Sequence, residues 1–119
     1  MLVKFNEKNL SVLDLEAILY MNDKEFDEKF AGTAIRRAKR IGLQRNACVA
    51  LGNTSNIKAL KPLKYGLCFG ETLVRQHAAW AIGNLRYKQS ISILKEALIT
   101  EKSTIVLKEI KAAIEYCNE

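Results

Sequence analysis

The sequence predicts an all-α fold, a solenoid of short helices built on a repeated pattern. The 119 residues include only one proline and six glycines. Ala, Leu, Lys and Glu are frequent, and these residues lose little side-chain freedom in a helix. Apolar residues recur at helical spacing, and a motif near the middle of the chain returns farther on. We expect one domain over residues 1–119, with short helices over 1–53 and two helix pairs over 54–119.

Cap signals define two short helices near the N-terminus. Ser11 suits the N-cap of a helix SVLDLEAILYM, because its hydroxyl can accept from a backbone N–H in the first turn. Asn22 or Asp23 suits the cap of a second helix, DKEFDEKF, whose early acidic residues match the positive end of the helix dipole. The apolar residues expected to share faces of these helices are Leu13, Ala17 and Tyr20 in the first and Phe26 and Phe30 in the second.

Glycines then suggest where two further helices stop. Gly32 is expected to end the second helix, and Thr33 to cap a basic helix that Gly42 ends. A fourth helix is expected over residues 43–51. Four short helices therefore precede the repeats.

The repeat is a helix pair. Ala50-Leu51-Gly52-Asn53 recurs as Ala81-Ile82-Gly83-Asn84, an offset of 31 residues, and a weaker third copy follows in residues 106–114. The pairs are expected over 56–69 with 72–85, and over 88–99 with 103–117, with Thr72 and Ser103 as caps and a frayed or kinked start near Pro62. The predicted core comprises Leu51, Leu63, Leu67, Ala78, Ala81, Ile82, Leu94, Leu98, Ile110 and Ile114.

The period and the segment V-R-x-x-A-A-x-A-I-G resemble HEAT-like repeats in their short bacterial form, an α-α superhelix. Tetratricopeptide and ankyrin repeats have similar periods, but their signature patterns are absent.

No run of about 20 apolar residues or extended signal-peptide core is present, so we expect a cytoplasmic location and no membrane partner. Cys48, Cys68 and Cys117 lie in apolar surroundings without CxxC spacing, which favours buried reduced thiols over disulfides or metal ligands.

Charge is concentrated in the middle third of the chain. The net charge is +6, yet residues 33–64 carry eight basic residues and no acidic residue. Between Glu28 and Glu71 there is no carboxylate, which leaves the cations without partners nearby in the sequence. This asymmetry indicates a polyanionic partner. A charge run can also be no more than a solvated face.

A cationic ridge is predicted on the helix Thr33–Ile41. Its apolar stripe would contain Ala34, Ile35, Ala38 and Ile41. The basic residues would take the remaining faces and bind phosphates, with counterion release as the driving force. These residues are Arg36, Arg37, Lys39 and Arg40, joined by Arg45, with Lys58, Lys61 and Lys64 as an outer rim.

The joined segments GTAIRRAKR, RNACVALGN and RQHAAWAIG carry a narrower resemblance. Together they are similar to the C-terminal region of epoxyqueuosine reductase, the enzyme that completes queuosine in certain transfer RNAs. The resemblance covers essentially the whole chain. In that family the chemistry belongs to other domains, which bind cobalamin and two four-iron four-sulfur clusters through cysteine-rich motifs absent here.

The resemblance thus implies a non-catalytic, RNA-facing HEAT-like module that needs no cofactor of its own. It would act in queuosine biosynthesis, with a transfer RNA as partner and a cobalamin and iron–sulfur catalytic domain in cis or in trans. The chain would be either a fragment or a separate small protein. A protein–protein adaptor that binds an acidic partner is the alternative from another functional class.

Two arginines, one histidine and one tryptophan have open roles. Arg45 and Arg75 each stand near the start of a predicted helix, and they would either line the inner surface or pair with helix ends. His77 would contact RNA or lie half-buried on its helix, and it has no acidic partner suited to catalysis. Trp80 shares a face with His77 and is expected to pack between repeats rather than to stack on a base.

Overall fold

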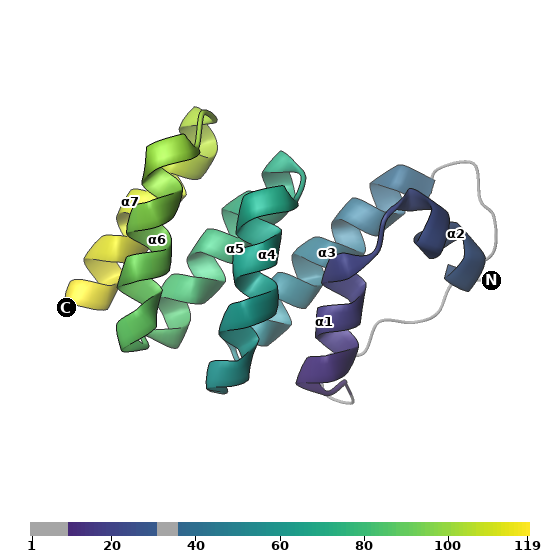
Figure 1. Ribbon diagram of the computed structural model, residues 1–119, viewed down its shortest axis with the longest axis horizontal. Coiled ribbons are helices and arrows are strands. Elements are labelled where there is room, and N and C mark those ends of the chain that lie inside the picture. The colour runs from purple at the N-terminus through teal and green to yellow at the C-terminus, as the bar shows by residue number, and fades with distance from the viewer. Residues whose placement is uncertain (1–9, 31–35) are drawn as a thin grey trace.

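The computed structural model describes residues 10–30 and 36–119, and of Phe30, Arg36 and Arg37 it describes the backbone alone (Figure 1). Within these ranges every regular element is helical, which confirms the all-α prediction. The elements are α1 Val12–Tyr20, α2 Asp23–Phe30, α3 Arg36–Gly52, the 3₁₀ turn η2 Ile57–Ala59, α4 Leu60–Phe69, α5 Thr72–Leu85, α6 Lys88–Thr100 and α7 Thr104–Asn118.

The helices form two layers. In Figure 1, α1, α4 and α6 lie in front and α3, α5 and α7 lie behind them. The molecule measures 15 Å along its shortest axis, the depth expected of two helices whose axes are about 10 Å apart. Three pairs therefore stack side by side, namely α1 with α3, α4 with α5, and α6 with α7. Helix α2 is inserted into the connection of the first pair.

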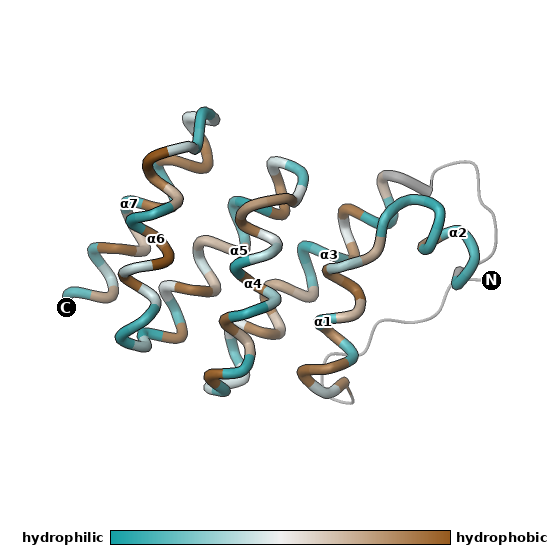
Figure 2. Tube along the Cα trace, viewed as in Figure 1, coloured by the Kyte–Doolittle hydropathy of each residue, from teal (hydrophilic) through white to brown (hydrophobic). Residues whose placement is uncertain are grey.

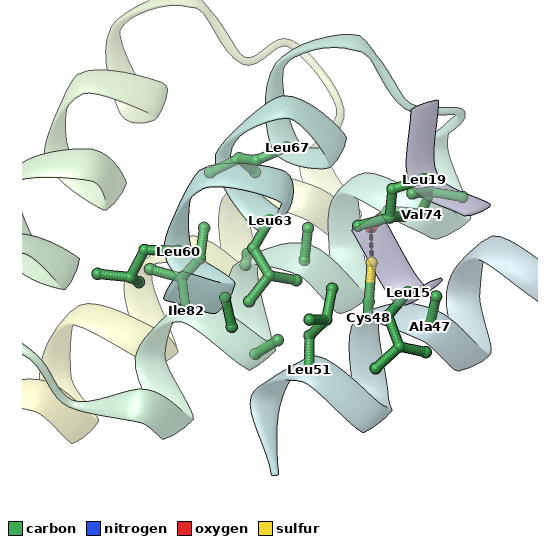
Figure 3. Close-up of a cluster of buried hydrophobic side chains, with 14 of the residues drawn as sticks. Leu15, Leu19, Ala47, Cys48, Leu51, Leu60, Leu63, Leu67, Val74 and Ile82 are labelled. Carbon is green, nitrogen blue, oxygen red and sulfur yellow. Dashed lines mark hydrogen bonds between the residues drawn. The ribbon is translucent and has the colours of Figure 1, made fainter. Parts of the chain in front are cut away.

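The core lies between the two layers (Figure 3). Apolar and polar residues alternate along each helix (Figure 2), so that each helix directs one face inward. Eight of the ten predicted core residues are buried, whereas Leu98 and Ile114 are partly buried. The thiol of Cys48 donates to the carbonyl of Val74 within this core. Burial raises the pKa of this thiol to about 12, so it stays protonated at neutral pH.

The repeated glycines are contact points between consecutive second helices. A Cβ atom added to Gly52 would lie 2.8 Å from the Cβ of Ala81, and one added to Gly83 would lie 2.7 Å from the Cβ of Ala113. Ala81 and Ala113 are equivalent positions in successive copies. The same backbone approach is therefore used twice, between α3 and α5 and between α5 and α7, and it leaves no room for a side chain at either glycine.

Several sequence predictions are confirmed at the level of single elements. The second and third helix pairs occupy nearly the expected ranges, and η2 replaces a regular first turn before Pro62. The hydroxyl of Ser11 accepts from the backbone of Asp14, whose carboxylate accepts in return from the Ser11 N–H. Ser103 caps α7. Of the two candidates for the cap of α2, Asn22 accepts from the Glu25 amide.

The predicted helix end at Gly42 is wrong. Helix α3 runs without interruption from Arg36 to Gly52, so three helices rather than four precede the later pairs in the described ranges. None of the described glycines has a positive φ angle. Gly42 therefore lacks the left-handed conformation by which glycine commonly ends a helix. The expected roles of Gly32, Thr33, Ala34 and Ile35 lie outside the described residues.

Other local predictions also fail, and in α1 and α3 the reason is that packing selects a different helix face. Helix α1 buries Leu15, Ile18 and Leu19, while Leu13 and Ala17 are exposed and Tyr20 is partly buried. In α3 the expected apolar position Ala38 is exposed. The N-cap of α5 is Glu71 rather than Thr72. All three cysteines are unbridged, but of the three thiols predicted to be buried only Cys48 is, since Cys68 is exposed and Cys117 is partly buried.

Candidate nucleic-acid interface

Helix α3 carries most of the predicted basic ridge, and its buried stripe divides that ridge. Gln44, Ala47, Cys48 and Leu51 are buried at spacings of three and four residues. Arg40 lies four residues before Gln44 on the same stripe, and only 11% of its side chain is exposed. The opposite, outward side of α3 contains Lys39, Gly42, Arg45 and Val49, all partly exposed.

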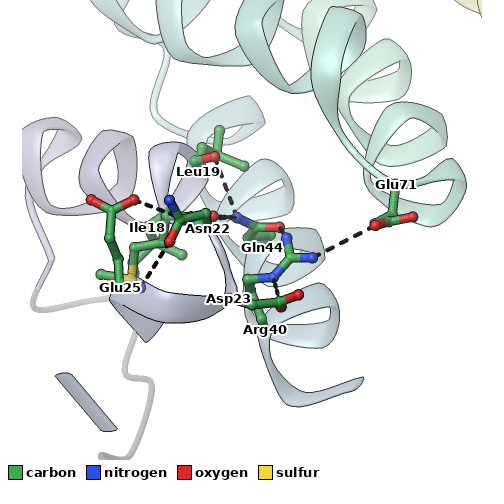
Figure 4. Close-up of polar contacts among 9 residues, drawn as sticks. Ile18, Leu19, Asn22, Asp23, Glu25, Arg40, Gln44 and Glu71 are labelled. Carbon is green, nitrogen blue, oxygen red and sulfur yellow. Dashed lines mark hydrogen bonds and ion pairs between the residues drawn. The ribbon is translucent and has the colours of Figure 1, made fainter. Parts of the chain in front are cut away.

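Arg40 is held by three side chains from different segments (Figure 4). Its Nε donates to Oδ1 of Asp23 in α2 at 2.7 Å, and one terminal nitrogen donates to Oε1 of Gln44 at 2.9 Å. The other terminal nitrogen lies 3.6 Å from a carboxylate oxygen of Glu71. The lack of acidic residues near Arg40 in the sequence therefore does not leave it unpaired, because folding brings in Asp23 and Glu71 from the two flanking segments.

Gln44 and Arg75 occupy equivalent positions in two copies of the repeat, 31 residues apart. Both side chains donate to carbonyls at the end of the first helix of their pair. The amide nitrogen of Gln44 donates to the carbonyls of Ile18, Leu19 and Met21 at the end of α1 (Figure 4). The guanidinium of Arg75 donates to the carbonyl of Gly70 at the end of α4. Each side chain thus donates to carbonyls at the end of the first helix, where backbone N–H donors are few. Of the two roles considered for Arg75, the structure contains the helix-end contact.

Arg75 also joins the second pair to the third. Its Nε and one terminal nitrogen donate to the two carboxylate oxygens of Glu101 at 3.0 and 3.1 Å, a bidentate pair. Glu101 also accepts from the backbone of Lys102 and Ser103. Burial acts to raise the pKa of Glu101, but the hydrogen bonds from Arg75 and from these amides outweigh it, so the pKa lies below its ordinary value.

Three predicted site residues are accessible on the layer formed by α3, α5 and α7. Lys39 and Arg45 lie on the outward side of α3, where Nε of Arg45 donates to the side chain of its neighbour Asn46 at 3.1 Å. His77 lies on α5, with Nδ1 2.9 Å from the carbonyl oxygen of Leu73. Arg36 and Arg37 form the first turn of α3. Among the predicted residues whose side chains the structure describes, Lys39, Arg45 and His77 are accessible, whereas Arg40 and Arg75 are ion-paired.

The expected lysine rim does not adjoin these residues. Lys58, Lys61 and Lys64 are exposed, but they belong to η2 and α4, in the opposite layer from α3. Figure 1 shows α4 in front and α3 behind, and α3 packs mainly against α5 and α1. Because these cations are close in the sequence, they are expected to form one basic surface. The first and second helices of each pair lie in different layers, so the cations are divided between the two layers.

Sequence reasoning missed two features of this layer. The first is the set of acidic partners Asp23, Glu71 and Glu101, which lie far from their arginines in the sequence. The alignment of Arg75 with Gln44 across the repeat was a signal that Arg75 has a structural role. The second feature is a groove formed by two hollows of about 260 and 300 Å³ beside Trp80. Trp80 is partly buried and packs on the core, in keeping with its predicted role, but it also lines both hollows.

The described residues show neither a metal centre nor a membrane span. In residues 10–30 and 36–119, no three His, Cys, Asp or Glu side chains form a group that could hold a metal ion. No helix in the same ranges is long and apolar enough to cross a bilayer.

Comparison with known proteins agrees with this architecture. A family model described as HEAT repeats matches residues 29–115. An uncharacterised protein from the gldA 3′ region of Geobacillus stearothermophilus is 33% identical over 102 residues, which are 85% of this chain and 47% of that protein. The chain thus spans about half the length of this curated relative.

Solved structures of epoxyqueuosine reductase match most of the chain. A crystal structure of the enzyme with an epoxyqueuosine-modified tRNA-Tyr stem loop matches with a TM-score of 0.76 and 31% identity, over 88% of this chain and 28% of that one. The enzyme from Bacillus subtilis matches with a TM-score of 0.74 and 32% identity, over 86% and 28%. The chain is therefore similar to a part of this enzyme, as its sequence motifs predict.

Proposed function

Because the chain belongs to the HEAT repeat family, we propose that it is a non-catalytic helical module that binds the phosphate backbone of a transfer RNA. In this proposal it corresponds to the C-terminal part of an epoxyqueuosine-reductase-like enzyme in queuosine biosynthesis. The catalytic domain, with its cobalamin and iron–sulfur clusters, would lie in cis or in trans.

One observation carries the proposal. The crystal structure of epoxyqueuosine reductase that matches 88% of this chain was solved with a tRNA stem loop. The distribution of charge supports it, because eight of the 19 basic residues fall in the acid-free segment 33–64. Phosphate contacts need only a row of positioned cations, since counterion release supplies the driving force.

The fold suggests which predicted residues contact RNA and which position them. Lys39 and Arg45 lie outward on α3, and Arg36 and Arg37 form its first turn. We assign phosphate contacts to these four, with His77 on the neighbouring helix. Arg40 and Arg75 already donate to carboxylates and carbonyls. Their predicted part in RNA binding becomes an indirect one, in which they hold α3 and α5 against the neighbouring helices.

Binding of a tRNA-Tyr stem loop at 50 and 200 mM salt tests the proposal. If about four phosphates are engaged, affinity should fall by about two decades over this range. A variant with Arg36→Gln, Arg37→Gln, Lys39→Gln and Arg45→Gln should lose most of the binding and most of its salt dependence. Arg40 is left unchanged because its loss would disturb the fold.

The matched control removes four exposed lysines from α6, α7 and the turn between them, Lys95, Lys102, Lys108 and Lys111, each changed to Gln. Equal losses in the two variants would mean that net charge alone governs binding and that no defined site exists. Absence of binding at 50 mM salt would favour the adaptor function with an acidic protein partner. Iron analysis of anaerobically purified protein provides a separate check, because a stoichiometric cluster would contradict a non-catalytic module.

A further inference from the structure

The groove beside Trp80 has a chemical character different from that of the basic residues. Its two hollows lie along α5 and α7, with Val49 of α3 at one margin. Both hollows are lined by Trp80 and by Glu109, so the indole and this carboxylate stand together at the boundary between them. Val49 lies one helical turn beyond Arg45. The groove and the accessible cations of α3 therefore belong to the same layer.

Glu109 is the formally charged residue of this groove. Among the described residues that line the hollows there is no other Asp, Glu, Lys or Arg. Glu109 is a partly exposed residue, and within the described part of the chain no hydrogen bond or ion pair engages its carboxylate. A carboxylate with no cationic partner among the described residues attracts a cation at short range, against the long-range repulsion of a chain of net charge +6.

The neutral polar side chains around it also present acceptors. Nδ1 of His77 must donate to the Leu73 carbonyl, because a carbonyl can only accept. The other ring nitrogen of the neutral imidazole is then an acceptor. The amide nitrogen of Asn84 likewise donates to the carbonyl of Gly52 at 3.0 Å, which leaves its side-chain oxygen available. A ligand that satisfies this groove needs several donors and a positive charge.

From this arrangement we infer that the groove binds an arginine side chain of a partner polypeptide, with the guanidinium between the indole of Trp80 and the carboxylate of Glu109. A guanidinium offers five N–H donors and no acceptor, which complements the carboxylate of Glu109, and N–H groups of the flanking peptide can donate to the acceptors of His77 and Asn84. Its flat face packs on an indole, the best of the aromatic rings for a cation. The molecule contains a related contact nearby, where the guanidinium carbon of Arg86 lies 4.9 Å from the ring centroid of Tyr116.

Charge separates this ligand from the other candidates. A nucleotide would place a phosphate near Glu109, and free arginine would bring its own α-carboxylate into the same groove. An arginine within a polypeptide has neither, and a groove that extends across two helices can also accept its flanking residues. This inference does not depend on RNA binding, since it concerns other side chains and the opposite charge.

The fluorescence of Trp80 reports the site directly because the chain contains no other tryptophan. The probe is the peptide acetyl-Gly-Arg-Gly-amide, titrated at low salt. We expect a saturable change in Trp80 emission, whereas the same peptide with citrulline should bind at least about tenfold more weakly, because citrulline keeps the shape but not the charge. Free arginine should also bind more weakly than the peptide.

Glu109→Gln should weaken binding of the arginine peptide by about tenfold or more. The matched control is Glu115→Gln, which removes the same charge from an exposed position of α7 outside the groove and should leave binding unchanged. Equal effects of the two substitutions, or equal binding of the citrulline peptide, would overturn the inference. A saturable response to uridine or guanosine monophosphate, without one to the arginine peptide, would overturn it too and would assign the groove to RNA. Unchanged circular dichroism and thermal midpoints of both variants exclude a folding artefact.

Discussion

The first helix pair, α1 with α3, and the second, α4 with α5, meet the same requirement with different chemistry. In both, a side chain from the second helix donates to carbonyls at the end of the first helix. In the first pair this residue is the neutral Gln44, which receives a hydrogen bond from Arg40. In the second it is the charged Arg75, which also pairs with Glu101 at the start of the next connection.

The difference shows that a basic residue at a helix-pair junction should not be counted as a ligand contact until its position in the fold is known. Arg40 and Arg75 both looked available in the sequence, and both are engaged in the structure. Lys39 and Arg45, close to Arg40 in the sequence, point outward because they lie across the helix from the buried stripe.

The largest expected effect separates Arg40 from Arg45. Arg40→Glu places a third carboxylate beside Asp23 and Glu71 and leaves Gln44 without its donor. We expect a loss of about 3 kcal/mol in the free energy of unfolding, measured by urea denaturation. Arg45→Glu changes the same charge on the outward side of α3 and should shift stability by no more than about 0.5 kcal/mol. Similar losses in the two variants would contradict the division of α3 into two faces.

The glycine contacts between second helices come next. Gly52→Ala and Gly83→Ala should each cost about 2 kcal/mol of unfolding free energy, because the added Cβ would meet both the Cβ and the backbone of an alanine within 3.0 Å. Gly66→Ala is the matched control, since its Cβ would meet only side chains at 3.7 Å. It should be neutral or stabilising by up to about 1 kcal/mol. A stabilising Gly83→Ala would show that the helices can move apart at no cost.

Acid titration distinguishes the two junction residues. At neutral pH, Gln44→Met and Arg75→Met should each cost about 1–2 kcal/mol. The contribution of the Arg75–Glu101 pair is fully present above the ordinary glutamate pKa of about 4.3 and is lost as pH falls through the lowered pKa of folded Glu101. The penalty of Arg75→Met should therefore shrink in acid. The penalty of Gln44→Met should stay constant, because the carbonyl groups that Gln44 contacts do not titrate. Urea unfolding of both variants at pH 7, 5, 4 and 3 measures the two penalties. Parallel pH profiles would argue against the ion pair as the source of the difference.

The smallest effect concerns Gly42, within helix α3. Its φ angle is not positive, and a Cβ added there would find only the end of the Arg45 side chain at 3.9 Å. Gly42→Ala should stabilise the fold by about 0.5–1 kcal/mol, seen as a higher thermal midpoint. If Gly42 ended a helix in the left-handed conformation, the substitution would instead destabilise it.

The sequence by itself determined the repeat and most of the core. Residue types that favour helix, the apolar spacing and the copies of Ala-Leu-Gly-Asn sufficed, because they are local or periodic signals. They located the later helix pairs, two of the caps and eight fully buried core residues. The motifs also identified the similarity to part of epoxyqueuosine reductase, which the solved structures share.

Only the tertiary structure decided how the charges are used. Asp23, Glu71 and Glu101 reach their arginines across 17 to 31 residues of sequence, and no periodicity encodes such pairs. It also decided that α3 continues through Gly42 and that α1 belongs to the first pair, because the packing of α3 on α1 and α5 selects the buried stripe. The groove beside Trp80 arises in the same way, since its lining comes from three helices that meet only in the folded protein.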